Sequence, residues 1–264
     1  AEWDFVELAM ETLSEQYPDH FVLVREGANW HWTNRLLGLE QAFVFGDAET
    51  LPHPPFEYMA RQMQGDFTLH DQREDDLWMD GGMVTAQADW SLKFDLGMSF
   101  RQWHAPVPKA AELGVFDRGL RFLLMLQHGK PVRRLNWTMT INPRLDTSPE
   151  NYLVWGADRA SVTPDNALDK VHLRVELQTL YRLPRSHAIL FSIRCYLLPL
   201  RDIVRVPKWG RRLHRVLGAL DPALSSYKGL DLYRPTVVSV LSHYDDGAEL
   251  TPGILPDLAQ LEDA

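Results

Sequence analysis

Residues 171–197, VHLRVELQTLYRLPRSHAILFSIRCYL, predict two neighbouring antiparallel strands joined by a short turn. From Val171 to Gln178 apolar and polar side chains alternate, which is the period of a strand with two different faces. The polar face of this first strand carries His172, Arg174, Glu176 and Gln178. Because all four can form hydrogen bonds and project from one side of the strand, we expect this face to be the wall of a pocket.

Arg194 lies in the apolar stretch AILFSIRCYLL of the return strand. A buried guanidinium without a partner is costly, so we expect Arg194 to be buried beside an anion. A structural ion pair is the alternative to a chemical role for these arginines. Such a pair could join Arg174 to Glu176 along one strand, or Glu176 to Arg194 across the hairpin.

The remaining periodic segments predict helices inserted between antiparallel strands. We expect helices over 3–17, from 55 or 56 to 63, over 110–127, and around 200–206 and 208–217, and strands over 67–70, 77–79, 83–90 and 134–141. In the last of these strands Leu135, Trp137, Met139 and Ile141 form the face expected to be packed. This order of elements indicates an α+β fold, with helices covering one face of an antiparallel sheet.

The chain of 264 residues shows no internal repeat and no linker between two cores, so we expect one domain. Within it, residues 1–54 form an N-terminal helical and loop extension, 55–235 the core, and 236–264 a C-terminal tail. The last ~20 residues contain proline and acidic residues and read as mobile.

Charge and cysteine content narrow the function classes. A net charge of −9 argues against a nucleic-acid partner, and the basic stretch 208–215 reads as a solvated or interface helix. The single cysteine, Cys195, excludes an internal disulfide and a self-contained iron–sulfur cluster, and it fits a reducing, cytoplasmic location. The longest apolar stretches fall short of the ~18 residues of a membrane span, so we expect no membrane association.

The segment WHAPVP, residues 103–108, is the second informative place. His104 stands between Trp103 and a loop stiffened by Pro106 and Pro108, which would hold its imidazole in a fixed direction. Such an imidazole could be the axial ligand of a haem, or a hydrogen-bonded loop histidine without that role. The chain has no dinucleotide-binding or phosphate-binding glycine motif, no H-E-x-x-H and no G-x-S-x-G.

Several ordered blocks resemble one family. They are MARQMQGDF (59–67), WSLKFDLGMSFRQWHAPVP (90–108), KPVRRLNW (130–137), LRVELQTLYRLPRSHAILFSIRCYL (173–197) and YKGL (227–230). Together they are similar to the haem-dependent oxidative N-demethylases, over about residues 55–230. The departures are Leu177 and Tyr181 in place of arginines, His187 in place of a small residue, and Lys109 in place of glycine.

The resemblance implies a PAS-like fold with a pocket for haem b between the sheet and its helices. It also implies an enzyme that uses O2 to remove a methyl group from a small secondary amine such as dimethylamine, releasing formaldehyde. Electrons would come from a partner reductase that carries the flavin (FMN) and iron–sulfur centres, which agrees with one cysteine and no dinucleotide motif here. An oligomer is compatible with this assignment.

The resemblance also suggests roles for individual residues. His104 is the expected iron ligand, and Glu176, Arg174 and Arg194 are the expected catalytic residues, with Glu176 holding the amine or relaying a proton. The further side chains expected near haem or substrate are Arg174, Gln178, Asn136, Tyr196 and Thr138. Cys195 as a thiolate ligand is disfavoured, because it points to the opposite face from Arg194.

Two other functions remain open for a chain with these features. A non-catalytic PAS-like haem sensor of gas or redox state would bind haem without turning over an amine. A haem-free assembly subunit would keep the fold and dock the reductase.

Overall fold

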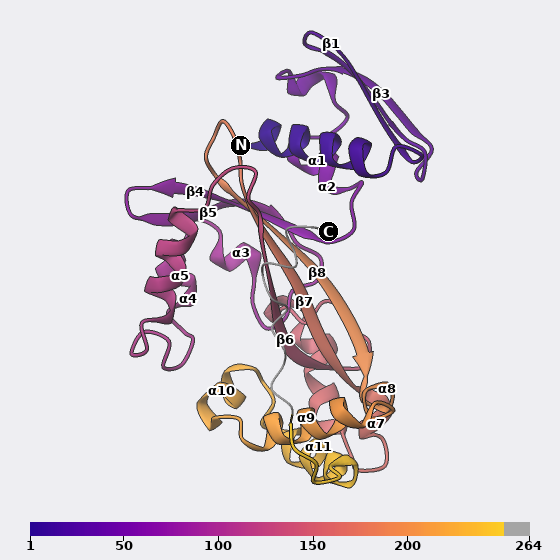
Figure 1. Ribbon diagram of the computed structural model, residues 1–264, viewed down its shortest axis with the longest axis vertical. Coiled ribbons are helices and arrows are strands. Elements are labelled where there is room, and N and C mark those ends of the chain that lie inside the picture. Colours follow the sequence, from indigo (N-terminus) through magenta and orange to yellow (C-terminus); the bar gives the residue numbers. More distant parts are fainter. Residues whose placement is uncertain (251–264) are drawn as a thin grey trace.

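The structure is a computed structural model that describes residues 1–250. It contains two antiparallel sheets with helices packed around them, which confirms the α+β class (Figure 1). One sheet has three strands in the order β1-β2-β3, and the other has five in the order β5-β4-β8-β7-β6. The domain boundaries expected from the sequence stay a prediction.

The first 60 residues form two helices and the three-stranded sheet: α1 (Glu2–Gln16), β1 (Phe21–Glu26), β2 (Asn29–Asn34), β3 (Leu39–Val44), and α2 (Pro55–Ala60). The three strands contradict the expected helical and loop extension. They form because the aromatic side chains of NWHWTN alternate, so that Trp30 and Trp32 are both buried on one face. A two-residue turn joins β1 to β2, and Gly27 supplies its positive φ of 62°.

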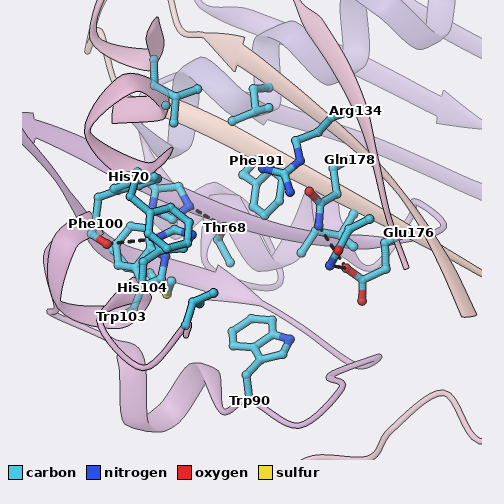
Figure 2. Close-up of a pocket in the computed structure, with 18 of the residues that line it drawn as sticks. Thr68, His70, Trp90, Phe100, Trp103, His104, Arg134, Glu176, Gln178 and Phe191 are labelled. Atoms are coloured by element: carbon cyan, nitrogen blue, oxygen red, sulfur yellow. Dashed lines mark hydrogen bonds between the residues drawn. The ribbon is translucent and has the colours of Figure 1, made fainter. Parts of the chain in front are cut away.

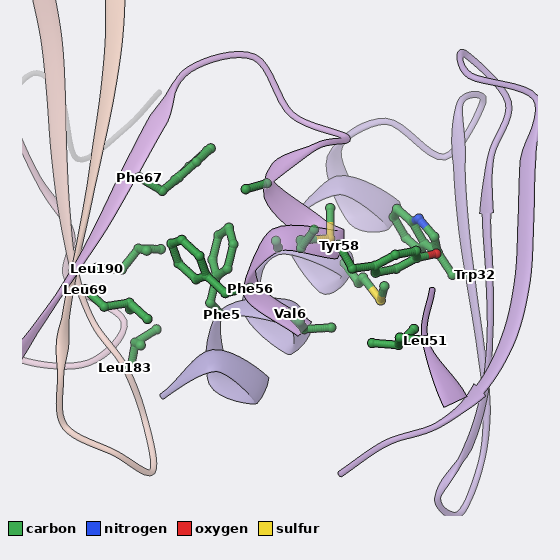
Figure 3. Packing of buried hydrophobic residues seen from close by; sticks show 14 of the residues in the cluster. Phe5, Val6, Trp32, Leu51, Phe56, Tyr58, Phe67, Leu69, Leu183 and Leu190 are labelled. Carbon is green, nitrogen blue, oxygen red and sulfur yellow. The ribbon is translucent and has the colours of Figure 1, made fainter. Parts of the chain in front are cut away.

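A continuous apolar cluster joins this unit to the large sheet (Figure 3). Phe5 of α1 packs against Phe56 and Phe67, with ring centroids 4.8 and 5.2 Å apart. Phe67 and Leu69 project from one face of the large sheet, whereas Thr68 and His70 project from the other. At this end the sheet is therefore covered on both faces, not on one as the sequence suggested.

The large sheet is built from β4 (Asp66–Arg73), β5 (Asp76–Met83), β6 (Val132–Ile141), β7 (Val171–Arg182), and β8 (Ile189–Pro199). The predicted hairpin is confirmed, with His172 opposite Pro199 and Arg182 opposite Ile189. The predicted strand over 83–90 is wrong. Those residues form a loop whose backbone is held by Asp66, which accepts hydrogen bonds from the backbone N–H groups of Thr85 and Ala86.

The apolar face of β6 is packed over only half of its length. Met139 and Ile141 are 3% and 4% exposed, whereas Leu135 is 69% exposed. The packed half lies against the C-terminal helices, which share a core with Leu217 and Tyr233. The prediction of a fully packed face is therefore wrong for the first half of the strand.

Three helices line the cavity-bearing side: α3 (Leu92–Asp95), α4 (Phe100–His104), and α5 (Val115–Leu124). The predicted helix over 110–127 is shorter because Lys109 and Gly114, with φ of 60° and 59°, break it before Val115. A positive φ favours glycine, which explains physically why a glycine was expected at position 109. His187, where a small residue was expected, also has a positive φ of 57°.

The remaining helices gather at the other end of the sheet (Figure 1): α6 (Tyr152–Trp155), α7 (Ala167–Lys170), α8 (Leu200–Ile203), α9 (Pro207–Gly218), α10 (Pro222–Tyr227), and α11 (Arg234–Leu241). The two helical segments expected around 200–217 are confirmed. The expected C-terminal tail begins at 236, yet α11 runs to Leu241 and buries Val237 and Leu241. Residues 251–264 of that tail lie outside the described residues.

Arg182 fastens α5 to the sheet from the end of β7. Its guanidinium is buried and donates hydrogen bonds to the carbonyl oxygens of Leu123, Leu124 and Leu126. Leu123 and Leu124 end α5, where carbonyls lack the i+4 partners of the helix interior, and Leu126 lies just beyond the helix. The cation therefore stabilises the end of α5 and fixes the helix across one face of the sheet.

Candidate functional site

A cavity of about 650 Å³ lies between the large sheet and the helices α4, α5 and α10. All five strands of this sheet contribute to its floor, and residues 88–95, which include α3, line one side. Its lining includes Thr68, His70, Asp89, Trp90, Asp95, Phe100, Trp103, His104, Phe116, Arg134, Asn136, Thr138, Glu176, Gln178, Phe191, Tyr227 and Lys228 (Figure 2). A volume of this size is typical of cofactor and small-molecule sites.

The cavity has an apolar end with two imidazoles. His104 is in the last turn of α4, a helix started by a capping box in which Ser99 and Gln102 bond each other's backbone N–H groups. Its Nδ1 lies 2.9 Å from the carbonyl oxygen of Phe100. A carbonyl can only accept, so Nδ1 carries the proton and Nε2 keeps its lone pair.

Aromatic rings fix the plane of this imidazole. The His104 ring lies 4.1 Å from the Phe100 ring and 4.3 Å from the Phe116 ring, measured between centroids. Burial lowers the pKa of His104 to about 4, so the ring is neutral near pH 7. A neutral imidazole with Nδ1 bonded to a carbonyl and Nε2 open is the usual state of a histidine that ligates a metal.

His70, which the sequence did not single out, is the second imidazole of this end. It projects from β4, is buried, and its Nε2 lies 2.7 Å from Thr68 Oγ1. Nδ1 of His70 has no hydrogen-bond partner among residues 1–250. Burial lowers its pKa to about 3, so this ring too is neutral near pH 7.

The haem-free protein is expected to lose stability as the pH falls from 6.5 towards 5. His70 stays neutral in the folded state, whereas in the unfolded state it takes up a proton near pH 6.5. A histidine with a lowered folded-state pKa therefore contributes stability that is present above pH 6.5 and lost below it, by up to about 1.4 kcal/mol per pH unit. Urea unfolding at several pH values measures the slope.

His70→Gln is the matched variant for this measurement, because glutamine does not titrate. In this variant the free energy of unfolding is expected to change less steeply with pH than in the wild type. Part of the pH dependence should remain, because His104 contributes in the same direction. Equal slopes in both proteins would contradict the burial of a neutral imidazole at position 70.

The other end of the cavity is polar and centres on Glu176. Its carboxylate accepts hydrogen bonds from Asn136 Nδ2 at 3.2 Å, Gln178 Nε2 at 3.0 Å and Arg174 Nε at 3.3 Å. Glu176 and Gln178 are neighbours on the same face of β7, and Asn136 faces Glu176 across the β6–β7 pair. Of the four residues predicted for this wall, Glu176 and Gln178 line the cavity, whereas His172 and Arg174 do not.

Arg174 lies behind the cavity wall instead of in it. It is fully buried, at 0% exposure, and its guanidinium donates to the carbonyl oxygens of Leu145 and Ala86 and to Sγ of Cys195. Together with the bond to Glu176, these contacts occupy four of the five N–H donors of the guanidinium within the protein. The structure therefore gives Arg174 the structural ion pair that was the alternative to a chemical role.

Arg194 and Tyr196 lie on the outer face of the sheet, and the expected burial of Arg194 is wrong. The register pairs Arg194 with Leu177, on the apolar side of β7. Its guanidinium is exposed and donates to Gln64 Oε1, and Tyr196 is 48% exposed. Cys195 is on the inner face beside Arg174, and burial raises its thiol pKa to about 11, so a thiolate is disfavoured there.

The sequence also missed the charged residues that reach the cavity from the far wall. Asp89 has a positive φ of 58° and pairs with Arg159 at 2.6 Å. Lys228 donates to the carbonyl oxygen of Trp137 at 2.7 Å, and burial lowers its pKa. Asp95 of α3 also lines the cavity, and Arg134 lines it from β6 in the floor. The sequence blocks that carry the family resemblance contain Asp95, Arg134 and Lys228. Their place in these blocks is the signal by which the sequence could have pointed to these three residues.

A family model described as haem-dependent oxidative N-demethylase, alpha subunit-like, matches residues 1–238. The chain belongs to this family. Membership confirms the resemblance carried by the blocks between residues 55 and 230, and it extends the match over α1 and the three-stranded sheet. In residues 1–250 we find no helix with the length and apolar character needed to cross a bilayer.

The cavity residues fit the haem that the family name implies. His104 offers one open nitrogen in an apolar, aromatic surrounding, as a porphyrin with a single protein ligand requires. The opposite end offers the carboxylate and amides of Glu176, Gln178 and Asn136. One cavity thus contains separate places for an apolar macrocycle and for a small polar molecule.

Proposed function

We propose that this chain binds haem b through Nε2 of His104 and oxidises the N-methyl group of a small secondary amine. The observation that carries the proposal is the fixed His104 tautomer inside the large cavity of a chain that belongs to this family. Haem bound there would supply the redox chemistry by which O2 hydroxylates the methyl group, after which the product breaks down to formaldehyde and the shorter amine. Electrons would come from a partner reductase.

The polar end of the cavity would hold the amine. A secondary amine is protonated near neutral pH, and Glu176 is a carboxylate already oriented by Asn136, Gln178 and Arg174. Its three donors leave lone-pair capacity for one more hydrogen bond, such as that from an ammonium N–H. Asp95 adds a second carboxylate, and Tyr227 and Trp90 add aromatic faces that attract a cation.

The site residues thus have distinct tasks in the proposed reaction. His104 would fix the position of the cofactor, and Glu176 would orient the amine and accept its proton when the nitrogen must become neutral. The aromatic side chains around His104 would exclude water from the apolar end. Arg174 would act only through Glu176, as a positioning residue.

Reconstitution with haem tests the proposal directly. We expect a Soret band on adding haem to the purified chain, a spectral shift on adding dimethylamine, and formaldehyde when O2 and a chemical reductant are supplied. Glu176→Gln is expected to raise the dissociation constant for dimethylamine, measured from the spectral shift, by roughly 10-fold or more. The Soret band should remain, because the substitution removes only the charge of a charge-assisted hydrogen bond to the amine.

The same measurements separate the alternatives. A haem sensor would show the Soret band without an amine-dependent shift or formaldehyde. An assembly subunit would bind no haem at all. Either result would overturn the proposed amine oxidation.

A further inference from the structure

The charged residues that line the cavity are unevenly paired. Glu176 is held by Arg174, and Asp89 by Arg159, so two carboxylates have arginine partners that stand behind the wall. Asp95 differs from these two carboxylates, because burial and repulsion from Glu150 raise its pKa. The basic residues that face the cavity need a separate account.

Lys228 has unused donors. Among residues 1–250 its ammonium makes one hydrogen bond, to the carbonyl oxygen of Trp137, whereas an ammonium has three N–H groups. No carboxylate lies within ion-pair distance of Nζ in this part of the chain, although Glu176 and Asp89 are near enough to act on its pKa. The side chain is half-buried, and desolvation is the largest influence on it, lowering the pKa.

Arg134 is a second cation of this kind. It projects from β6 on the cavity side, in register with Gln178, and it lies near enough to His104 to lower the pKa of that ring. In residues 1–250 its guanidinium has neither an ion pair nor a hydrogen bond within the chain. Its five donors are therefore open to a ligand, and a planar guanidinium binds a carboxylate through two parallel bonds.

We propose that Arg134 and Lys228 bind the two propionate carboxylates of the haem. The inference rests on the proposed function, and it gives this task to neither Arg174 nor Arg194, the two arginines expected from the sequence to be catalytic. Haem b carries two propionates on one edge, and Arg134 on β6 and Lys228, bonded to the backbone of Trp137, both offer open donors to the cavity. Arg133 also borders the cavity, but it is in register with Thr179 and so projects from the opposite face of β6 to Arg134. Pairing offsets the cost of holding a partly desolvated ammonium without an anion.

The assignment also orients the macrocycle within the cavity. The propionate edge would lie along β6, and the apolar edge would lie towards Phe116 and Leu123 of α5. The carboxylates of Glu176 and Asp89 would remain free of the cofactor because their own arginines neutralise them. The polar end would border this edge, because Asn136 also lies on β6 and Arg134 is in register with Gln178.

Titration with haem and with its dimethyl ester tests the inference. The ester keeps the macrocycle and the iron but has no carboxylates. Wild type is expected to bind haem at least 10-fold more tightly than the ester, measured by Soret absorbance. Arg134→Met and Lys228→Met are each expected to weaken haem binding by roughly 10-fold, the factor for a lost charge-assisted hydrogen bond, and to leave binding of the ester within about 2-fold.

Arg194→Met is the matched control, because it removes the same kind of charge from the outer face of the sheet. It is expected to bind both porphyrins like the wild type. The inference is overturned if wild type binds haem and ester equally, or if the Arg134 and Lys228 variants lose both porphyrins to the same extent. If wild type binds neither porphyrin, the proposed function fails together with it.

Discussion

Arg174→Met is expected to lower the free energy of unfolding by about 3–5 kcal/mol. Arg174 is fully buried, and four groups depend on its guanidinium: the Glu176 carboxylate, the carbonyl oxygens of Leu145 and Ala86, and Cys195 Sγ. Methionine fills similar space but donates no hydrogen bond, so a buried carboxylate and two carbonyl oxygens lose their partner. Each such loss costs roughly 1–3 kcal/mol.

Urea unfolding measures this loss, with Arg194→Met as the control. Arg194 is exposed, so its replacement is expected to change the free energy of unfolding by no more than about 0.5 kcal/mol. Adding Glu176→Gln to Arg174→Met should recover part of the loss, because the charge left without its partner is removed. A loss under about 1 kcal/mol for Arg174→Met would contradict the role of this cation in the wall.

His104→Ala is expected to weaken haem binding by about 100-fold or more. Loss of an outer-shell partner typically costs ~10–100-fold in metal affinity, and here the ligand itself would be removed. The variant should also lose the Soret band of the histidine-ligated haem. Added imidazole should restore it, because the aromatic walls from Phe100 and Phe116 would still enclose the vacated place.

His70→Ala is the informative comparison, because His70 is the other imidazole of the same cavity. It is expected to keep the Soret band and its response to imidazole close to those of the wild type. If His70→Ala abolishes haem binding while His104→Ala leaves it intact, the ligand is His70 and our assignment is wrong. Circular dichroism of each variant before the titration establishes that the fold is retained.

The family membership indicates the type of chemistry, whereas the cavity indicates which residues could carry it out. Membership brings haem and oxidative N-demethylation as the family's description. The cavity adds which residues of this chain could divide the work: His104 at the apolar end, Glu176 at the polar end, and Arg134 with Lys228 along β6. The experiments above test each of these assignments separately.

Local periodicity predicted the elements whose two faces differ strongly. The alternation from Val171 to Gln178 predicted β7 and its polar wall, and Glu176, Gln178 and Asn136 do meet there. It failed for the N-terminal sheet, where only the short NWHWTN alternation signalled a strand. It also failed for 83–90, because contacts with the distant Asp66 hold that segment as a loop.

The sequence by itself determined the hairpin and the polar side of its first strand, because both depend on residues close together in the chain. It did not predict α4, the helix that ends at His104. Only the tertiary structure decided which side chains enter the cavity. Arg194 was assigned to the wrong face because strand pairing sets it opposite Leu177, and a register one residue away would have turned it inwards. Lys228 and Asp89 reach the same cavity from segments far apart in sequence, and such a meeting depends on packing that local patterns do not encode.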